Sequence, residues 1–143
     1  MATSTFLSNA TINLTQGATT TDLSDQANAV SITIGQDELE VTAFGDTGHR
    51  MVGGLQSVEV TMTLFLSYGA SEVEAILASC VGTGTTTLVI SPSGTTESAT
   101  NPEYTIANCM LANFTPINST VGEIATVEAT FTGGTWVRDV TAP

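Results

Sequence analysis

The segment 56-QSVEVTMTLFLS-67 decides the class of fold, because apolar and polar residues alternate along most of its length. One set of side chains is Val58, Val60, Met62, Leu64 and Leu66, and the other is Ser57, Glu59, Thr61 and Thr63. Successive side chains of a β-strand point to opposite faces of the sheet. The segment is therefore predicted to be a long strand with one apolar face and one polar, acidic face.

A second segment, residues 123–132, alternates in the same way. Its apolar set is Ala125, Val127, Ala129 and Phe131, and its other set is Ile124, Thr126, Glu128, Thr130 and Thr132. Shorter runs rich in β-branched residues predict further strands at 27–34, 39–43, 86–90, 104–114 and 136–140.

A single segment, 71-SEVEAILASC-80, has the period of a helix, with an apolar stripe at i, i+3, i+4 and i+7. Ser71 is expected to be the N-cap, with Glu74 completing a capping box and Gly82 closing the helix at C′. A helix this short is marginal alone, so it is expected to pack on the sheet.

Turns and termini complete the predicted organisation. Gly35 and the pair Asp37-Glu38 predict a turn, and 44-FGDTGHRMVGG-54 is expected to be a flexible loop because it holds four glycines. The Thr-rich residues 1–20 are expected to form an N-terminal arm that orders only against another surface, with at most a short strand around 11–15. Residues 21–143 are then a single β domain.

The composition limits both the fold class and the partners. The chain contains fourteen Asp and Glu residues but only two cationic side chains, Arg50 and Arg138, so the net charge is −12. Tight binding of nucleic acid or of an anionic membrane needs cations on the protein, although a nucleic acid that slides past does not. Thr and Gly are abundant and charged residues make up 11%, which is typical of a β-rich domain. The predicted class is mainly β: a β-sandwich or rolled antiparallel sheet with one flanking short α-helix.

One triplet suggests catalysis. Asp46-Thr47-Gly48 is the triplet of aspartic proteases, in which two aspartates share a proton. Those sites continue with a small Ser or Ala, whereas His49 and Arg50 follow here. An arginine so close favours the ionised aspartate. A loop aspartate that sets up a turn is therefore preferred to a protease, and no catalytic residue is expected.

A metal site is not expected either. His49 is the only histidine of the chain, and the carboxylates of 37–46 lack the spacing of a calcium-binding loop. A solvated acidic loop is the preferred interpretation. No cofactor is expected.

Cys80 and Cys109 lie beside apolar residues. The sequence leaves open whether they pair, and buried free thiols are the default. The chain shows neither the pattern of a signal peptide nor an apolar run of membrane-spanning length, so no membrane partner is expected.

Several segments follow one another in a recognisable order. They are Asp22-Leu23-Ser24, VSI at 30–32, VTAFGDTG at 41–48, Gly54-Leu55 at the start of the long strand, the short helix, TNPEYT at 100–105 and ATVEATF at 125–131. This order, over about residues 22–138, resembles that of the tail tube (major tail) proteins of long-tailed bacteriophages. The first twenty residues and His49-Arg50 lie outside the resemblance.

The resemblance implies a structural virion protein and no enzyme. Such proteins are β-sandwiches with a flanking helix that form hexameric rings, which stack into a hollow tail tube. Two strand pairs of each subunit join a continuous barrel, through which DNA passes without specific binding. Tape measure and tail terminator proteins are the implied further partners. The implied location is the phage tail, after assembly in the host cytoplasm.

The resemblance also assigns roles to residues. The polar faces of the two alternating strands are expected to line the lumen, where carboxylates and hydroxyls repel phosphate; the residues are Glu59, Thr61, Thr63, Thr126, Glu128 and Thr130. The alternative is that these faces are exposed to solvent and line no channel. The loop 37–54 is expected to contact the next ring or a neighbouring subunit through Asp37, Glu38, Glu40, Phe44, Asp46, His49 and Arg50. Arg50 is expected to pair with an acid of the adjacent subunit.

Two other classes of protein remain open. A capsid decoration or minor capsid protein has a similar composition, and the unmatched N-terminal arm favours it, whereas the long alternating strands favour the tube. A self-assembling surface-layer or adhesin domain is third, weakened by the missing export signal. An enzyme is last, because no catalytic constellation is present.

Overall fold

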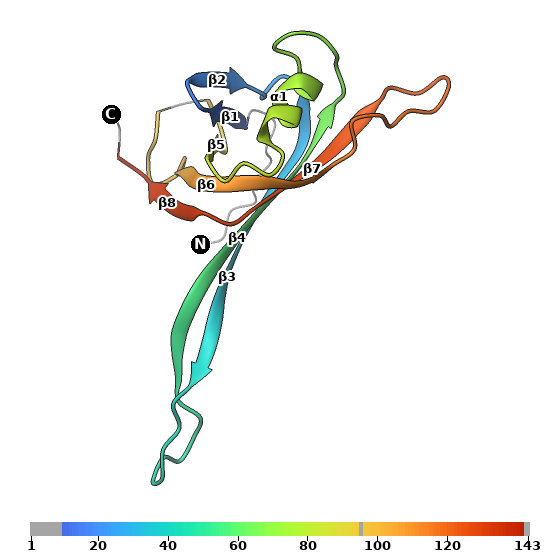
Figure 1. The fold of residues 1–143 in the computed structure, drawn as a ribbon. Helices are drawn as coiled ribbons and strands as arrows, with labels where there is room; N and C mark the ends of the chain where they lie inside the picture. Colours follow the sequence, from blue (N-terminus) through green and yellow to red (C-terminus); the bar gives the residue numbers. More distant parts are fainter. Residues whose placement is uncertain (1–9, 95, 142–143) are drawn as a thin grey trace.

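The computed structural model describes residues 10–94 and 96–141, which form eight strands and one short helix (Figure 1). The elements are β1 Thr11–Gln16, β2 Thr19–Asp22, β3 Ala27–Glu40, β4 Met51–Phe65, α1 Val73–Cys80, β5 Thr86–Ser91, β6 Glu103–Phe114, β7 Thr126–Thr132 and β8 Thr135–Asp139.

All strands belong to one antiparallel sheet that curls on itself. Its order is β2-β1-β5-β6-β7-β4-β3, and β8 pairs with β6 beside β7. The first half of β6 pairs with β5 and β8, and its second half pairs with β7. The predicted class, mainly β with a β-sandwich or rolled antiparallel sheet and one flanking short helix, is confirmed, and the strands form a single sheet.

A bend between β7 and β8 lets the sheet curl. Asn108 of β6 has φ +60°, and Gly133 and Gly134 opposite it have φ +83° and +88°. A Cβ atom on Gly134 would lie 2.2 Å from the carbonyl oxygen of Ala107. Only glycine fits this position, because the backbone of β6 occupies the space of a side chain.

The alternating segments place their apolar sides in the core, as predicted. The core side chains of β4 and β7 are at most 4% exposed; they are Val58, Val60, Met62, Leu64, Val127, Ala129 and Phe131. Burying each large side chain of this kind stabilises the fold by roughly 1.5–3 kcal/mol. Helix α1 covers the same side of the sheet through Val73, Leu77 and Cys80. Cys80 and Cys109 are buried free thiols.

The start of the helix differs from the prediction. The N-cap is Glu72, without a side-chain cap, and Ser71 has φ +68°. Ser67 satisfies the first turn instead: its Oγ accepts the N–H of Val73 at 3.2 Å and its carbonyl accepts that of Glu74 at 3.1 Å. The capping box is therefore wrong, because the chain enters the helix from the end of β4. Gly82 lies at C′ with φ +73°, as predicted.

The predicted N-terminal arm, residues 1–20, is corrected where the structure describes it. Residues 11–22 form the hairpin β1–β2, and β1 pairs with β5 of the same chain. Ile12 and Leu14 are 1% exposed and belong to the core, which is why this segment orders without a partner. Residues 1–9 of the predicted arm lie outside the described residues.

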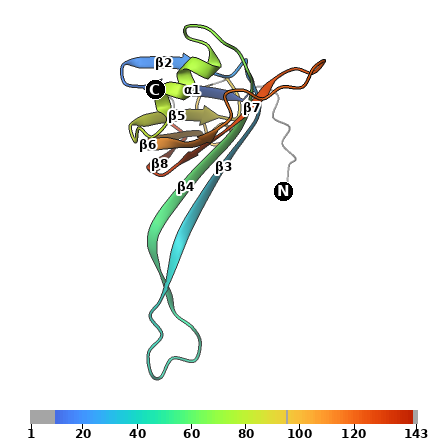
Figure 2. The same ribbon diagram turned by 45° about the vertical axis from the view of Figure 1, so that its right-hand side comes forward.

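The segment 35–54 also differs from the prediction. No turn interrupts it at Gly35–Glu38; β3 runs on to Glu40 with a register shift between Gln36 and Glu38. Its partner β4 begins at Met51, so the loop comprises only 41–50. The outer halves of both strands project from the body as a long hairpin arm (Figure 2). Both faces of this arm meet solvent, so the residues show no alternation by which a strand is recognised.

Candidate assembly and channel surfaces

The neighbouring strands β6, β7, β4 and β3 present one polar face on the side away from the core. Directly opposed residues of antiparallel strands share a face. Thr61 of β4 lies opposite Thr130 of β7 and Ser31 of β3, and Thr63 lies opposite Glu128. We call this surface the hydroxyl face; it consists of Ser31, Thr33, Ser57, Glu59, Thr61, Thr63, Asn113, Thr126, Glu128, Thr130 and Thr132.

All six predicted lumen residues lie together on the hydroxyl face. Glu59 and Glu128 are exposed, and the four threonines are half-buried between neighbouring strands. The prediction missed Ser31 and Thr33 of β3, although the alternation of Val30, Ile32 and Ile34 contains that signal. Whether the face lines a lumen remains a prediction.

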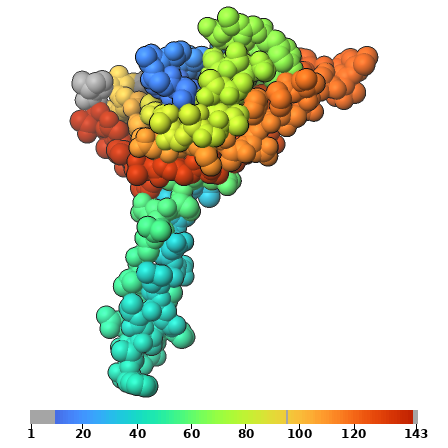
Figure 3. Space-filling view, in the orientation of Figure 1, coloured from blue at the N-terminus to red at the C-terminus, as the bar shows by residue number. Residues whose placement is uncertain are grey.

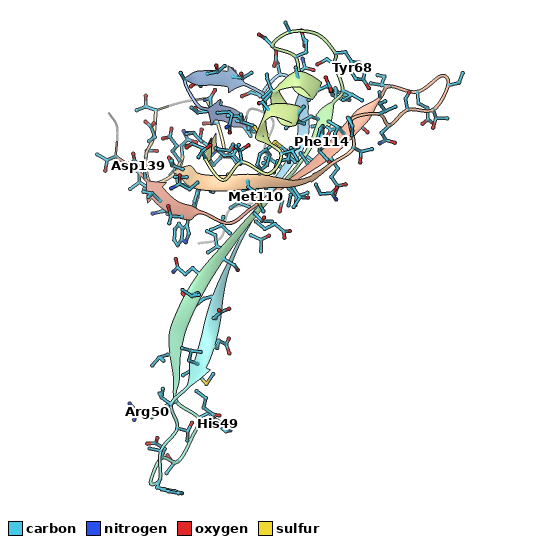
Figure 4. The ribbon with its side chains drawn as sticks, in the orientation of Figure 1. His49, Arg50, Tyr68, Met110, Phe114 and Asp139 are labelled. Atoms are coloured by element: carbon cyan, nitrogen blue, oxygen red, sulfur yellow. The ribbon has the colours of Figure 1, made fainter. Side chains whose placement is uncertain are left out.

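The hydroxyl face is acidic and carries no cation. The two cationic side chains of the protein lie elsewhere: Arg50 at the tip of the arm and Arg138 on β8. Phe65 and Met110 border the face as half-exposed apolar side chains, and Figure 4 shows Met110 on the side of β6 away from α1. Because only Glu59 and Glu128 supply charge, the face repels phosphate and offers it no ion pair.

The strands that carry the hydroxyl face leave backbone groups open at both edges. Among the described residues, β3 pairs only with β4. At the other edge, the second half of β6 pairs with β7 on one side and makes only an isolated bridge, Val81 to Leu111, on the other. Open edges accept further strands. The sheet is therefore able to continue into another copy on both sides.

The tip of the arm is an ordered loop. Asp46 Oδ2 accepts the N–H of Ala43 at 2.7 Å and lies 3.9 Å from Arg50 Nη1. His49 Nδ1 contacts Glu40 Oε2. Asp46 thus sets up the turn, and no second aspartate faces it within the described part of the chain. Arg50 pairs inside its own loop in the single chain, so its pairing with an adjacent subunit stays a prediction (Figure 4).

The arm also exposes large apolar side chains. Phe44 is fully exposed at the tip, Leu55 is 81% exposed and Leu39 is 52% exposed. Figure 3 shows the arm standing clear of the body. Large exposed apolar side chains on a projection are typical of surfaces that bind other proteins, so the arm is a candidate contact surface. Of the predicted contact residues, Phe44 has this character, and Asp37, Glu38 and Glu40 lie along the stem.

A second loop, residues 115–125 between β6 and β7, also projects from the body, and it was not among the predicted contact surfaces. It exposes Ile117, Val121 and Ile124 by 78% or more. Tyr68 holds its base, because its hydroxyl donates to the carbonyl of Pro116 at 2.7 Å (Figure 4). The apolar residues of this loop were a signal, but the sequence interpretation placed Ile124 in a strand.

At the opposite end of the body, where Figure 4 labels Asp139, Glu103 has Glu97 and Asp139 as charged neighbours. Partial burial raises the pKa of Glu103, and the neighbouring Glu97 and Asp139 raise it further. No group of three or more His, Cys, Asp or Glu among the described residues is placed to hold a metal ion. Among the described residues α1 is the only helix, and it is far shorter than a membrane crossing requires.

Comparison with solved structures places this fold among tubes and caps. One match is a chain of the PVC sheath/tube terminator of an extracellular contractile injection system, with TM-score 0.69, 16% identity, and coverage of 96% of this chain and 98% of that one. Another belongs to the tube-terminating cap of the anti-feeding prophage, with TM-score 0.64, 14% identity, and coverage of 99% and 95%.

A third match is a chain in the tail of an empty gene transfer agent particle, refined with C6 symmetry, with TM-score 0.55, 12% identity, and coverage of 92% and 95%. At these identities the likeness establishes the fold. No protein-family model matches the sequence, and no curated protein matches it significantly.

Proposed function

We propose that this chain is a structural subunit of a tail-type tube that assembles in stacked hexameric rings. The observation that carries the proposal is the hydroxyl face, a cation-free polar surface on strands whose two edges are open. Similar folds in a C6-symmetric tail and in tube-terminating assemblies support it. The subunit is a wall element and has no catalytic role.

The open edges supply the lateral contacts of this wall. The edge of β3 on one subunit pairs with the second half of β6 on the next, so the hydroxyl faces of all copies form one inner surface. The arm and the loop 115–125 then connect successive rings, since both expose apolar side chains away from the body. Tape measure and tail terminator proteins would bind at the inner surface and at the end of the tube.

The inner surface suits a channel through which DNA slides. Its charge comes from Glu59 and Glu128, and each ring repeats these carboxylates around the bore. Like charges keep phosphates away from the wall, and hydroxyl groups hold water in place of ion pairs. Such a subunit is a structural component of a particle and takes part in no metabolic reaction.

The first experiment is assembly of the purified chain at high concentration, followed by negative-stain electron microscopy. Hollow tubes of uniform width or stacked rings are the expected result. A chain that stays monomeric both alone and with a preformed tail end would overturn the proposal.

The second experiment identifies the inner surface. Glu128→Cys places a thiol on the hydroxyl face, and Glu72→Cys places one at the start of α1 on the opposite side. Assembled tubes are treated with a large PEG-maleimide. We expect modification of the Glu72→Cys tubes only, and equal modification of both variants after disassembly. Modification of Glu128→Cys tubes along their length would place the hydroxyl face outside.

A second candidate function is the cap that ends such a tube. The similarity to terminator and cap chains favours it. A cap forms discrete rings that bind one end of a tube and do not elongate, so the same micrographs distinguish the two roles. Capsid decoration is less favoured, because residues 10–20, which had suggested a capsid-binding arm, are part of the β domain.

A further inference from the structure

The two cysteines of the chain lie where the end of helix α1 meets β6. Val81, directly after the helix, forms a parallel bridge with Leu111 of β6. Because the bridge is parallel, Cys80 and Cys109 both precede their bridged residues, by one position and by two. One strand spacing across the bridge and one residue of offset along it put their α-carbons about 6 Å apart. Disulfides usually join α-carbons that are roughly 4.4–6.8 Å apart, so the backbone brings the pair within bonding range.

Both thiols also point into the same part of the core. Cys80 is fully buried, Cys109 is 1% exposed, and both belong to one cluster of core side chains. They converge on Thr86, the first residue of β5, which lies opposite Cys109 in the sheet. The Sγ of Cys109 donates to the carbonyl of Thr86 at 3.2 Å, and the side chain of the same threonine is hydrogen-bonded to Cys80. Thr86 therefore contacts both thiols.

Burial keeps the two thiols protonated in the closed fold. It raises the pKa of the Cys80 thiol, and it raises the pKa of Cys109 to about 11 with a smaller contribution from the nearby Cys80. Only a thiolate attacks a disulfide, so exchange waits for a local opening of the helix end. Each thiol donates a weak hydrogen bond, Cys80 to the carbonyl of Ile76 and Cys109 to that of Thr86. A disulfide has no proton to donate, so its formation leaves no unsatisfied donor in the core.

We propose that Cys80 and Cys109 are a latent disulfide, which joins the end of α1 to β6 in an oxidising medium. The oxidant is a low-molecular-weight disulfide such as oxidised glutathione. One protein thiolate attacks it and releases the first glutathione, and the second protein thiolate then displaces the other glutathione from the mixed disulfide. The two protein thiols lose two protons and two electrons, and the two released glutathione thiols carry both.

The bond changes the subunit according to its surroundings. It closes the loop 80–109, which contains all of β5, and thereby restricts the unfolded chain more than the folded one. The thiols stay reduced in the interior of a cell and pair outside it. This inference goes beyond the proposed function and concerns the single subunit, so it stands or fails without tube assembly.

The first measurement compares closure of the disulfide in the folded and in the unfolded chain. Dilute wild-type protein is equilibrated with mixtures of reduced and oxidised glutathione, in buffer and in concentrated urea, from both directions. Intact mass spectrometry after acid quenching counts the oxidised molecules, which are lighter by two hydrogen atoms. A bond that fits the fold stabilises it, so we expect an equilibrium constant about 100-fold larger in buffer than in urea. An equal or smaller constant in buffer would overturn the proposal, because the fold would then hold the thiols apart.

The matched control moves one thiol by one position along the helix. In the double variant Ser79→Cys with Cys80→Ser, the thiol stays at the helix end but lies on its exposed side, since Ser79 is exposed. The closed loop has nearly the same length, so both proteins are expected to give the same constant in urea. We expect the gain in buffer in the wild type only, together with a rise of about 10 °C in its midpoint of thermal unfolding on oxidation. An equal gain in the double variant, or an unchanged midpoint in the oxidised wild type, would contradict a bond specific to this pair.

Discussion

The indole Nε1 of Trp136 donates a hydrogen bond to Oε1 of Gln56 at 3.1 Å, and this bond joins β8 of the body to the root of the arm. Figures 1 and 2 show the outer parts of β3 and β4 projecting away from the body as the arm. The pair therefore helps to fix the direction in which the arm leaves the sheet.

Gln56→Leu is expected to loosen the root of the arm with little loss of stability. The bond is exposed, so its removal lowers the free energy of unfolding by less than about 1 kcal/mol. Hydrogen exchange of the amides at 54–58 is expected to accelerate several-fold. The control is Gln36→Leu, which removes a 2.7 Å bond to the carbonyl of Gly54 inside the arm. Equal exchange at the root in both variants would argue against a role for Trp136.

Gly134→Ala is expected to destabilise the fold strongly, by more than about 3 kcal/mol. Its Cβ would lie 2.2 Å from the carbonyl oxygen of Ala107, and neither backbone segment is free to move. Gly133→Ala is the matched control, because it has a similar positive φ and open space around it. The control is expected to lose roughly 1–2 kcal/mol from the left-handed conformation alone. Urea denaturation of both variants measures the difference, and similar losses would refute the steric explanation.

The sequence predicted those elements whose side chains face the core. Val58 to Leu64 and Val127 to Phe131 alternate because one side of each strand is buried, so their polar faces were also assigned correctly. The arm has no buried side, and its strand between Gly35 and Glu40 gave no such pattern. The strand β1 was allowed for only as a short strand around 11–15, because Ile12 and Leu14 are its only side chains that reach the core.

The candidate surfaces were predictable to a different extent. The alternation of side chains placed Thr61 and Glu128 on polar faces, and the resemblance implied that both faces line the lumen. That β4 and β7 are neighbours is seen only in the structure. The open edges of β3 and β6 depend on the order of strands in space, which a single sequence does not contain. In the single chain Arg50 lies near Asp46 of its own loop, so its pairing with an adjacent subunit remains a prediction.

Phe44→Ser is expected to weaken assembly without affecting the subunit. Phe44 is fully exposed at the tip of the arm, so its removal changes no contact within the chain. If the tip binds a neighbouring ring, the concentration needed for tube formation rises at least tenfold, which corresponds to about 1.4 kcal/mol per contact. Light scattering against concentration measures this threshold. Val121→Ser in the other projecting loop tests whether the effect is specific to the arm, and an unchanged threshold in Phe44→Ser would remove the arm tip from the interface.

Glu103→Gln is expected to flatten part of the pH dependence of stability. Partial burial and the carboxylates of Glu97 and Asp139 raise the pKa of Glu103 above its ordinary value of 4.5. The folded state then holds this proton more tightly than the unfolded state, so its contribution is complete below pH 4.5 and is lost as the pH rises through the folded pKa. At pH 7 the variant is expected to be slightly more stable than the wild type, by less than about 1 kcal/mol. Thermal unfolding from pH 4 to 7 tests this, and a variant that is less stable at pH 7 would contradict it.

Cys109→Ser is expected to reduce the loss of stability at alkaline pH. Burial raises the pKa of the Cys109 thiol from 9.0 to about 11, and its Sγ donates to the carbonyl of Thr86 at 3.2 Å. Between these pH values the unfolded chain gives up the proton and the folded chain keeps it, so the free energy of unfolding falls as the pH rises from 9 to about 11. Serine retains a donor for the Thr86 carbonyl and does not ionise in this range. Urea denaturation at pH 8 and at pH 10.5 is expected to show a smaller fall in the free energy of unfolding for Cys109→Ser than for the wild type. Both proteins contain the same tyrosines, so the contribution of tyrosine ionisation is equal in both. An equal fall in the free energy of unfolding in both proteins would mean that the thiolate is as stable in the fold as in water.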